Sequence, residues 1–357
     1  MQDLDDLNQI KKLDKSNVLG SVEALPKQCQ HAWEDINKVE VSDDYQNVDN
    51  LVMTGMGGSG LGARVIESIF SSQLRIPLIR VNDYDLPGFV NEKSLVICSS
   101  YSGSTEEVVA NAQQAIAKKA KWMAIGKGKD LIELAQKHQV PYYQINPIHN
   151  PSQQPRMAIG YSVIAQLGLV SKAKLIQLSH EEIEEIVKTM EEVQEKIKVD
   201  IPEKENPAKQ LAKKMLNKII VYAASRHLTG AIHTVKNQLN ENAKTFATRF
   251  DIPELNHHLM EGLKHPKANQ QNLFFFLVQS ELYPKRIQQR VNLTQDVIEQ
   301  NKVEVFVWQA KSQKKLTQAF ELIQFGAYVN FYLTMLYGIN PAPIPWVNYF
   351  KEKLNKS

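Results

Sequence analysis

The chain has 357 residues, of which 43% are hydrophobic and 23% are charged. These proportions are ordinary for a folded globular protein. The length predicts two domains, because a single hydrophobic core rarely organises more than about 250–300 residues. The formal net charge of +3 is too small to indicate a nucleic acid or a membrane as the partner of this protein.

Two further features bear on the class of protein. The acidic N-terminal residues 1–6 contain no apolar signal core, and the longest apolar stretch, 322–339, is interrupted by polar residues. A membrane-spanning helix needs about 20 mostly apolar residues, so we predict that 322–339 is a helix buried between a sheet and the other domain. The chain has only two cysteines, Cys29 and Cys98, which we expect to be reduced thiols in a cytoplasmic protein.

The first half of the chain alternates between predicted strands and helices. Residues 1–45 carry apolar side chains at helical spacing and predict N-terminal helices. Residues 46–170 contain five short apolar runs that predict strands, at 51–54, 77–81, 95–98, 121–125 and 141–145. Helical patterns lie at 61–70, 105–118, 129–138 and 156–168. Strands and helices that alternate with such short connections predict a parallel sheet covered by helices on both faces.

The second half repeats this alternation after a connection at 171–207. In the charged stretch 171–200, Ile and Val recur every three or four positions, which predicts a surface helix between domains; residues 202–207 are the predicted linker. Residues 208–340 form the second predicted domain, with strands at 218–223, 274–278 and 303–307 and helices at 229–245, 284–300 and 315–338. Residues 341–357 form a tail.

Two short segments rich in glycine and hydroxyl side chains carry most of the functional information. Gly55-Met56-Gly57-Gly58-Ser59-Gly60 and Ser99-Ser100-Tyr101-Ser102-Gly103-Ser104-Thr105 each follow a predicted strand and open a predicted helix. Glycines let the backbone approach a ligand closely, and a helix N-terminus offers unpaired N–H groups and a positive potential. Hydroxyls add neutral donors. Two such turns facing one crevice predict a site for a phosphorylated small molecule, and the second domain lacks equivalent turns.

The glycine segment alone has another interpretation. A strand, Gly55-x-Gly57-Gly58-x-Gly60 and a helix also match the dinucleotide fingerprint, with Asp83 near the position of a ribose-binding acid. The hydroxyls of the second turn favour a phosphomonoester, because a dinucleotide fold has no need of them there. Some of these hydroxyls could instead cap the helix that follows, which would explain one hydroxyl but not the run.

Candidates for proton transfer lie in the second half. Glu241 stands among amides in Asn237-Gln238-Leu239-Asn240-Glu241-Asn242-Ala243-Lys244 and is a candidate base. Sixteen residues later, His257 and His258 are adjacent. Side chains one residue apart usually diverge and no further ligand accompanies them at metal-ligand spacing, so a single catalytic imidazole is favoured over a metal site.

The tail combines rigidity with an amphipathic helix. Three prolines in five residues, Pro341 to Pro345, stiffen the approach to a short basic helix. The apolar side chains of that helix fall on one face: Trp346, Val347, Phe350 and Leu354. We expect this face to anchor the helix in the structure, which would aim the Lys351 ammonium into the crevice.

Taken together, these motifs resemble a known family. The two turns resemble the sugar isomerase (SIS) domain. The fuller set adds Pro155-Arg156-Met157-Ala158, the Glu241 segment, Pro253-Glu254-Leu255-Asn256-His257 and the tail lysine. This set is similar to the bifunctional phosphoglucose/phosphomannose isomerase family. The resemblance spans about residues 50–355 and implies an α/β fold with two SIS-type three-layer α/β/α domains and mainly parallel sheets.

The resemblance also implies an activity and a set of site residues. It implies an aldose–ketose isomerase that converts glucose 6-phosphate, with mannose 6-phosphate as a second candidate substrate, to and from fructose 6-phosphate through a cis-enediol. The phosphate would be held by Ser59, Ser100, Ser102 and Thr105 with the backbone of Gly57 and Gly58. Arg156 would stabilise the enediolate, Glu241 would shuttle the proton, and His257 and Lys351 would assist ring opening. No metal or nicotinamide cofactor is implied.

In this superfamily the histidine comes from the neighbouring subunit, so the resemblance implies a homodimer with His257 donated across the interface. Two positions depart from the family pattern. The chain reads His257-His258-Leu259 where His-Asn-Glu is common, and Ala342 stands near a threonine associated with accepting both sugar epimers. The alternatives are another SIS-domain phosphosugar isomerase or a non-catalytic phosphosugar-binding protein. A binding protein would have no reason to retain Glu241, His257 and Lys351 together.

Overall fold

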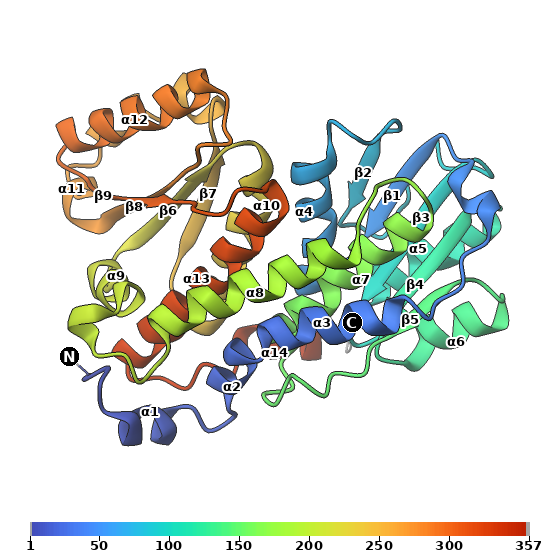
Figure 1. Cartoon of the computed structure of the whole chain (residues 1–357), viewed down its shortest axis with the longest axis horizontal. Helices are drawn as coiled ribbons and strands as arrows, with labels where there is room; N and C mark the ends of the chain where they lie inside the picture. Colours follow the sequence, from blue (N-terminus) through green and yellow to red (C-terminus); the bar gives the residue numbers. More distant parts are fainter. Residues whose placement is uncertain (1, 355–357) are drawn as a thin grey trace.

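The computed structural model describes residues 2–354. Two parallel β-sheets stand on opposite sides of a layer of helices (Figure 1). The first sheet has the strand order β2-β1-β3-β4-β5, and every pair in it is parallel. Its strands are β1 (Asn50–Thr54), β2 (Leu78–Val81), β3 (Ser94–Ser100), β4 (Lys121–Gly126) and β5 (Tyr142–Gln144). The five predicted strands of the first half are confirmed.

The central strands of this sheet are buried on both faces, and apolar side chains lie on each face. Along β1 and β3, Leu51, Met53 and Leu95 pack on one face, whereas Val52 and Val96 pack on the other, because successive side chains of a strand point in opposite directions. The first face is covered by α4 (Leu61–Phe70) and α7 (Ile159–Lys172), and the second by α5 (Glu106–Ala117) and α6 (Lys129–Lys137). The predicted three-layer arrangement is therefore present.

The second sheet has the order β7-β6-β8-β9 and is also entirely parallel. Its strands are β6 (Ile219–Ala224), β7 (Ala247–Asp251), β8 (Leu273–Gln279) and β9 (Glu304–Gln309). The sequence did not predict β7. This strand lies at the edge of the sheet and four of its five residues are only partly buried, so it lacks the apolar run by which the other strands are identified.

Helices α10 (Thr229–Asn242) and α13 (Lys315–Leu336) cover the inner face of this sheet, and α12 (Lys285–Gln300) covers its outer face. Every residue of α13 except Lys315 is buried, which confirms the prediction of a buried helix over most of 322–339. Among the residues that the structure describes, no helix is long and apolar enough to cross a membrane.

The remaining helices surround the two sheets. The N-terminal helices are α1 (Leu7–Leu13), α2 (Val18–Glu23) and α3 (Leu25–Ile36), and α8 (His180–Ile197) bridges the two halves along α3 and α13. A capping box between Ser179 and Glu182 begins α8. The predicted linker is largely helical instead: a short turn at 203–205 leads into α9 (Pro207–Met215), whose first turn is capped by the Asn206 side chain. The short α11 (Asn269–Asn272) precedes β8.

The two halves meet where α4 crosses α10. A Cβ atom at Gly230 of α10 would lie 2.4 Å from the Arg64 carbonyl oxygen of α4, so the two helix backbones are in direct contact. Apolar side chains from both sheets belong to one continuous core that passes through this crossing. The two sheets are therefore held in a fixed relation, and so are the side chains that each half contributes where the halves meet.

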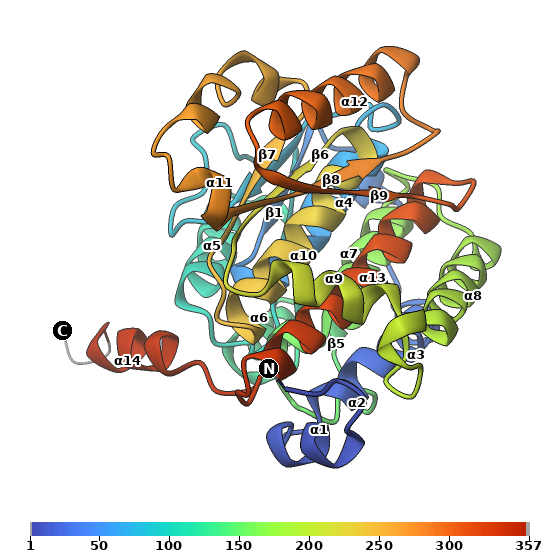
Figure 2. The same ribbon diagram turned by 90° about the vertical axis from the view of Figure 1, so that its left-hand side faces the viewer.

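The tail helix does not follow its prediction. Helix α14 (Pro345–Leu354) forms as expected, but none of its side chains is buried, and Figure 2 shows it projecting from the body of the protein. Its predicted anchors are all exposed: Trp346 by 81%, Val347 by 41%, Phe350 by 65% and Leu354 by 45%. The apolar side chains are present, but none of them is buried among the residues that the structure describes. Residues 355–357 of the predicted tail lie outside the described part.

Candidate active site

The two turns predicted to bind phosphate lie side by side. The turn Gly57–Gly60 follows β1 and the turn 101–105 follows β3, and these strands are neighbours in a parallel sheet, so both turns stand at its carboxyl edge. The Ser59 hydroxyl accepts a hydrogen bond of 2.9 Å from the Tyr101 N–H. This bond joins the turns and leaves the Ser59 proton free to be donated to a ligand.

Within the second turn, one predicted phosphate ligand lies deeper than the others. Ser100 is fully buried; its hydroxyl accepts from the Gly103 N–H at 3.1 Å and is bonded to the Thr105 hydroxyl at 2.7 Å. Ser102 is exposed and Thr105 is partly exposed. Ser100 therefore holds the turn in shape, while Ser102 and Thr105 are the hydroxyls that a ligand can reach.

The capping alternative can be checked at α5. Thr105 occupies the N-cap position, but its side chain makes no hydrogen bond to the first turn of α5, because the hydroxyl is bonded to Ser100. The N–H groups at the start of α5 are thus not capped by a side chain. Gly57 in the neighbouring turn has φ +50°, and a Cβ there would meet nothing within 4 Å. The first turn thus presents backbone to open space at Gly57, whereas in the second turn a Cβ at Gly103 would lie 1.7 Å from the Gly128 carbonyl oxygen.

Arg156 joins the two halves of the crevice. It lies in the turn Pro155–Met157, beside the backbone of Gly58, and is only 3% exposed. Its Nε donates to Asn242 Oδ1 of α10 at 2.6 Å, and its Nη2 donates to the carbonyls of Pro341 and Ala342 at 2.8 Å each.

The remaining terminal nitrogen of Arg156, Nη1, donates to Gln154 Oε1 at 3.1 Å. Since Nη1 carries two protons, one N–H has no partner among the described residues. Burial lowers the pKa of Arg156, while the charge of Glu241 opposes that shift. Arg156 thus holds α10 and the start of the tail together through its hydrogen bonds, and one of its N–H groups stays available to a ligand.

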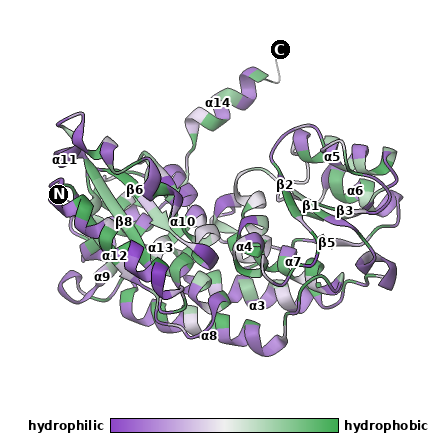
Figure 3. Ribbon diagram, turned by 90° about the horizontal axis from the view of Figure 1, so that it is seen from above, coloured by the Kyte–Doolittle hydropathy of each residue, from purple (hydrophilic) through white to green (hydrophobic). Residues whose placement is uncertain are grey.

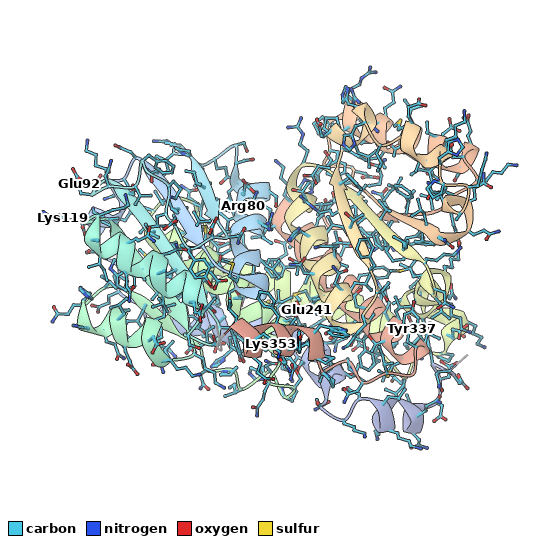
Figure 4. The ribbon with its side chains drawn as sticks, turned by 180° about the vertical axis from the view of Figure 1, so that it is seen from behind. Arg80, Glu92, Lys119, Glu241, Tyr337 and Lys353 are labelled. Carbon is cyan, nitrogen blue, oxygen red and sulfur yellow. The ribbon has the colours of Figure 1, made fainter. Side chains whose placement is uncertain are left out.

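Glu241 stands next to this arginine at the C-terminal end of α10, facing the space between the halves (Figure 4). Within residues 2–354 its carboxylate has no hydrogen-bond or ion-pair partner. Burial raises the pKa of Glu241, and the positive charges of Arg156, Lys244, Lys351 and Lys236 work against that shift. A half-buried carboxylate with a raised pKa and no fixed partner is suited to accept and return a proton.

Lys244 is a site residue that the sequence did not single out. Its ammonium donates to the carbonyls of Glu241, Asn242 and Pro341 at 3.0, 3.1 and 2.7 Å. Burial and then the charge of Arg156 lower the pKa of Lys244 to about 8. Like Arg156, this lysine ties the end of α10 to the start of the tail.

His257 is not brought to Glu241 by the fold of one chain. The Ser225 hydroxyl donates to the Ile252 carbonyl at 2.7 Å, so the chain leaves β7 beside the N-terminal end of α10. The turn Glu254–His257 follows there, whereas Glu241 lies at the other end of α10, about 18 Å away at the helical rise of 1.5 Å per residue. His257 is exposed. His258 is also exposed, but its ring packs on Phe250 with the ring centroids 5.8 Å apart.

Lys351 is exposed on α14, and it is near enough to Glu241 for its charge to lower the pKa of that carboxyl. The structure thus places the two turns, Arg156 and Glu241 near one another where the halves meet, with Lys351 close enough for its charge to act on Glu241, and it leaves His257 towards the other end of α10. Asn242 and Gln238, which both bond to Arg156, were visible in the sequence only as part of the amide-rich segment. Their spacing of four residues places them on one helix face. Gln154, Lys244 and the tail carbonyls gave no sequence signal.

The chain is similar to known proteins in sequence and in fold. Residues 204–354 match the family model of the bacterial phospho-glucose isomerase C-terminal SIS domain. Similar solved structures include a hypothetical protein, TT0462, from Thermus thermophilus (TM-score 0.73, 16% identity, 95% of this chain and 90% of that one). A glucose-6-phosphate isomerase like protein from the same organism has a TM-score of 0.62 at 16% identity and covers 97% of this chain and all of its own. At such identities these structures show a common fold.

Curated relatives are closer in sequence. The chain is 36% identical to a bifunctional phosphoglucose/phosphomannose isomerase from Caldicellulosiruptor bescii over 94% of this chain and 98% of that protein. Proteins of the same name from Aquifex aeolicus and Thermoplasma volcanium are 28% and 30% identical, over 92% and 86% of this chain and 95% and 91% of theirs. With this identity over nearly its whole length, the chain belongs to the bifunctional phosphoglucose/phosphomannose isomerase family.

Proposed function

We propose that this protein is a phosphohexose isomerase that interconverts glucose 6-phosphate and mannose 6-phosphate with fructose 6-phosphate. The observation that carries the proposal is the unpaired, half-buried Glu241 carboxylate beside Arg156, which itself lies against the phosphate-binding turn at Gly58. The names of the curated relatives give the two sugar phosphates. With both cysteines buried as free thiols, we also propose a cytoplasmic location.

In the proposed isomerisation, each of these groups has a separate role. Ser59, Ser102, Thr105 and the uncapped start of α5 hold the phosphate, with Ser100 shaping the turn and Gly57 and Gly58 contributing backbone. Glu241 removes the proton from one of the two reacting carbons and returns it to the other, so that one carboxylate serves both half-reactions. The free N–H of Arg156 stabilises the enediolate oxygen, on which negative charge develops.

Ring opening needs a second acid–base pair, which the crevice of one chain only half supplies. Lys351 lies near Glu241, whereas His257 follows the segment beside the start of α10, and α10 extends about 18 Å from its first residue to Glu241. We propose a homodimer in which the partner's His257 completes each crevice. The exposed position of His257 beyond the end of β7 suits a residue that acts on a neighbouring molecule.

The direct test is conversion of fructose 6-phosphate by the purified protein in EDTA, with both aldose phosphates quantified. We expect glucose 6-phosphate and mannose 6-phosphate to form, and Glu241→Gln to lower kcat by at least about a hundredfold, since general-base catalysis contributes at least that much. Glu191→Gln, on the exposed side of α8, is the matched control. Near wild-type turnover by Glu241→Gln would remove Glu241 from the mechanism.

Glu241→Gln should also make the protein more stable. Because burial raises the folded-state pKa above 4.5, the ionised carboxylate destabilises the fold at every pH above that folded-state value. The gain in unfolding free energy should therefore be larger at pH 8 than at acidic pH, and it should vanish as the pH falls below about 4.5, where the group is protonated in both states. Denaturant unfolding at both pH values measures it; an unchanged or lower stability at the higher pH would contradict the assigned burial.

Mixing two inactive variants tests the shared site. In a hybrid of Glu241→Gln and His257→Ala chains, one crevice carries both lesions and the other is intact. After unfolding and refolding an equal mixture, half of the dimers are hybrids, so about a quarter of wild-type activity should return. His258→Ala alone should stay active. Recovery of no activity, with hybrids verified by mass, would place His257 and Glu241 in the same chain's site or His257 outside it.

A further inference from the structure

Basic side chains gather where the two halves meet, along the turns of α10 that precede Glu241. Helices α4 and α10 stand side by side between the two sheets (Figure 3), and Figure 4 places Arg80 on the side of the first half that faces the second. The side chains that interact electrostatically around this crossing are Arg64 of α4, Arg80 of β2, His233 and Lys236 of α10, and Arg249 of β7. This basic cluster therefore draws on both halves of the chain.

The basic cluster is distinct from the turns predicted to bind phosphate. The strand that carries Arg80, β2, and the strand that leads into the turn 101–105, β3, pair with opposite edges of β1. Neighbouring strands are about 4.8 Å apart, so β2 and β3 are separated by about 10 Å. Arg249 donates to the Thr229 carbonyl at the start of α10 at 2.9 Å, whereas Glu241 stands near the end of that helix. The cluster thus lies beside the earlier turns of α10 and away from the turn 101–105.

Two acidic side chains pair with only part of this cluster. Arg80 Nε lies 2.7 Å from Glu67 Oε2, and Arg249 Nη1 lies 3.1 Å from Asp251 Oδ1. The side chains of Arg64 and Lys236 have no hydrogen-bond or ion-pair partner within residues 2–354. Their N–H groups are therefore available to a ligand.

The cluster is buried enough for its excess charge to be costly. The side chains of Arg80 and Arg249 are 29% and 20% exposed, and Arg64, His233 and Lys236 are half-buried. Burial, and then the charges of Arg80 and Arg249, lower the pKa of Arg64 to about 10. Burial, and then the charge of Arg64, lower the pKa of His233 to about 3. Like charges held together away from water destabilise a fold, and such an arrangement is characteristic of a functional site.

We propose that the basic cluster is a second anion site, which binds one phosphate group between the two halves of the chain. Arg64 and Lys236 are its main ligands, because their donors have no other partner. A guanidinium presents its N–H groups in a fork that matches two oxygens of a phosphate, whereas an ammonium binds as a point charge. The inference goes beyond the isomerase function and does not depend on it.

Charge selects phosphate over other small anions. With Glu67 and Asp251 counted against the four cations, the cluster keeps an excess of two positive charges. A phosphate group carries about −1.5 to −2 at neutral pH, which matches this excess, whereas a carboxylate supplies half of it. At neutral pH the His233 ring is uncharged and can add one donor or one acceptor.

Thermal unfolding with inorganic phosphate tests the site. The protein carries Ser102→Ala and Thr105→Ala, which weaken the turn site, and phosphate replaces chloride at constant ionic strength. We expect the melting temperature to rise with phosphate, because a ligand that binds only the folded state stabilises it. Adding Arg64→Gln should raise the half-saturating concentration at least about tenfold, since hydrogen bonds between charged groups are strong. Adding Arg75→Gln instead, at an exposed arginine beyond α4, should leave it unchanged.

The same variants make a second prediction in chloride alone. At pH 7.5, below the pKa of about 10, Arg64 is charged in the folded and the unfolded state, so its full electrostatic cost is present. Arg64→Gln should therefore raise the melting temperature, and Lys236→Gln should do the same, whereas Arg75→Gln should not. A lower melting temperature for both cluster variants would show that these cations stabilise the fold without an anion, and would overturn the proposal.

Other anions distinguish the occupants. Stabilisation by inorganic phosphate but not by glycerol 3-phosphate identifies the free ion as the ligand, and stabilisation by both identifies a phosphoryl group on a carrier; each outcome supports the site. Acetate that stabilises as well as phosphate would overturn it. So would a phosphate effect that survives Arg64→Gln. If phosphate has no effect while Arg64→Gln changes the oligomeric state by light scattering, the cations bind another protein chain and the proposal is wrong.

Discussion

The arrangement of this site depends on the hydrogen bonds of one buried guanidinium. Arg156 lies against the phosphate-binding turn and binds Asn242 of α10 and two carbonyls of the tail. Removing such a group would leave several buried acceptors unsatisfied, which costs more than the bonds themselves contribute. Because its donors point in a fixed fork, Arg156 sets the position of Glu241 and of the root of α14 relative to the phosphate. One residue thereby serves both the fold and the chemistry.

The two halves can hold the groups of the site in fixed positions because they share one packed core. The backbones of α4 and α10 touch at Gly230, and one apolar core runs through both sheets. Keeping Glu241 half-buried and unpaired destabilises the fold, and the free energy of core packing offsets this loss. Such a loss of stability is common where a side chain must stay reactive. Burial raises the pKa of Glu241, and four cations around the carboxylate oppose that rise, which favours the ionised form that can accept a proton.

The sequence predicted those parts that arise from local pattern. The strands around helix 61–70 were identified from short apolar runs followed by glycine-rich turns, and Glu241 stood out among amides. β7 was missed because an edge strand needs no apolar run. The partners of Arg156 include backbone carbonyls, which have no sequence signature. The expected docking of α14 was wrong, because an apolar helix face does not by itself show whether the rest of the chain offers a surface for it. The separation of His257 from Glu241 follows from the length of α10 and from where the chain leaves β7, which required the structure.

The central claim is that one carboxylate in this crevice moves a proton between the two reacting carbons of a hexose phosphate. The most direct measurement is the conversion of fructose 6-phosphate in D₂O, with the aldose phosphates analysed by NMR. The account predicts deuterium at C2 of a fraction of the product molecules, because a proton held by Glu241 exchanges with solvent before it is returned. Product formed at full rate with no deuterium at C2 would show a direct hydride shift and contradict the account.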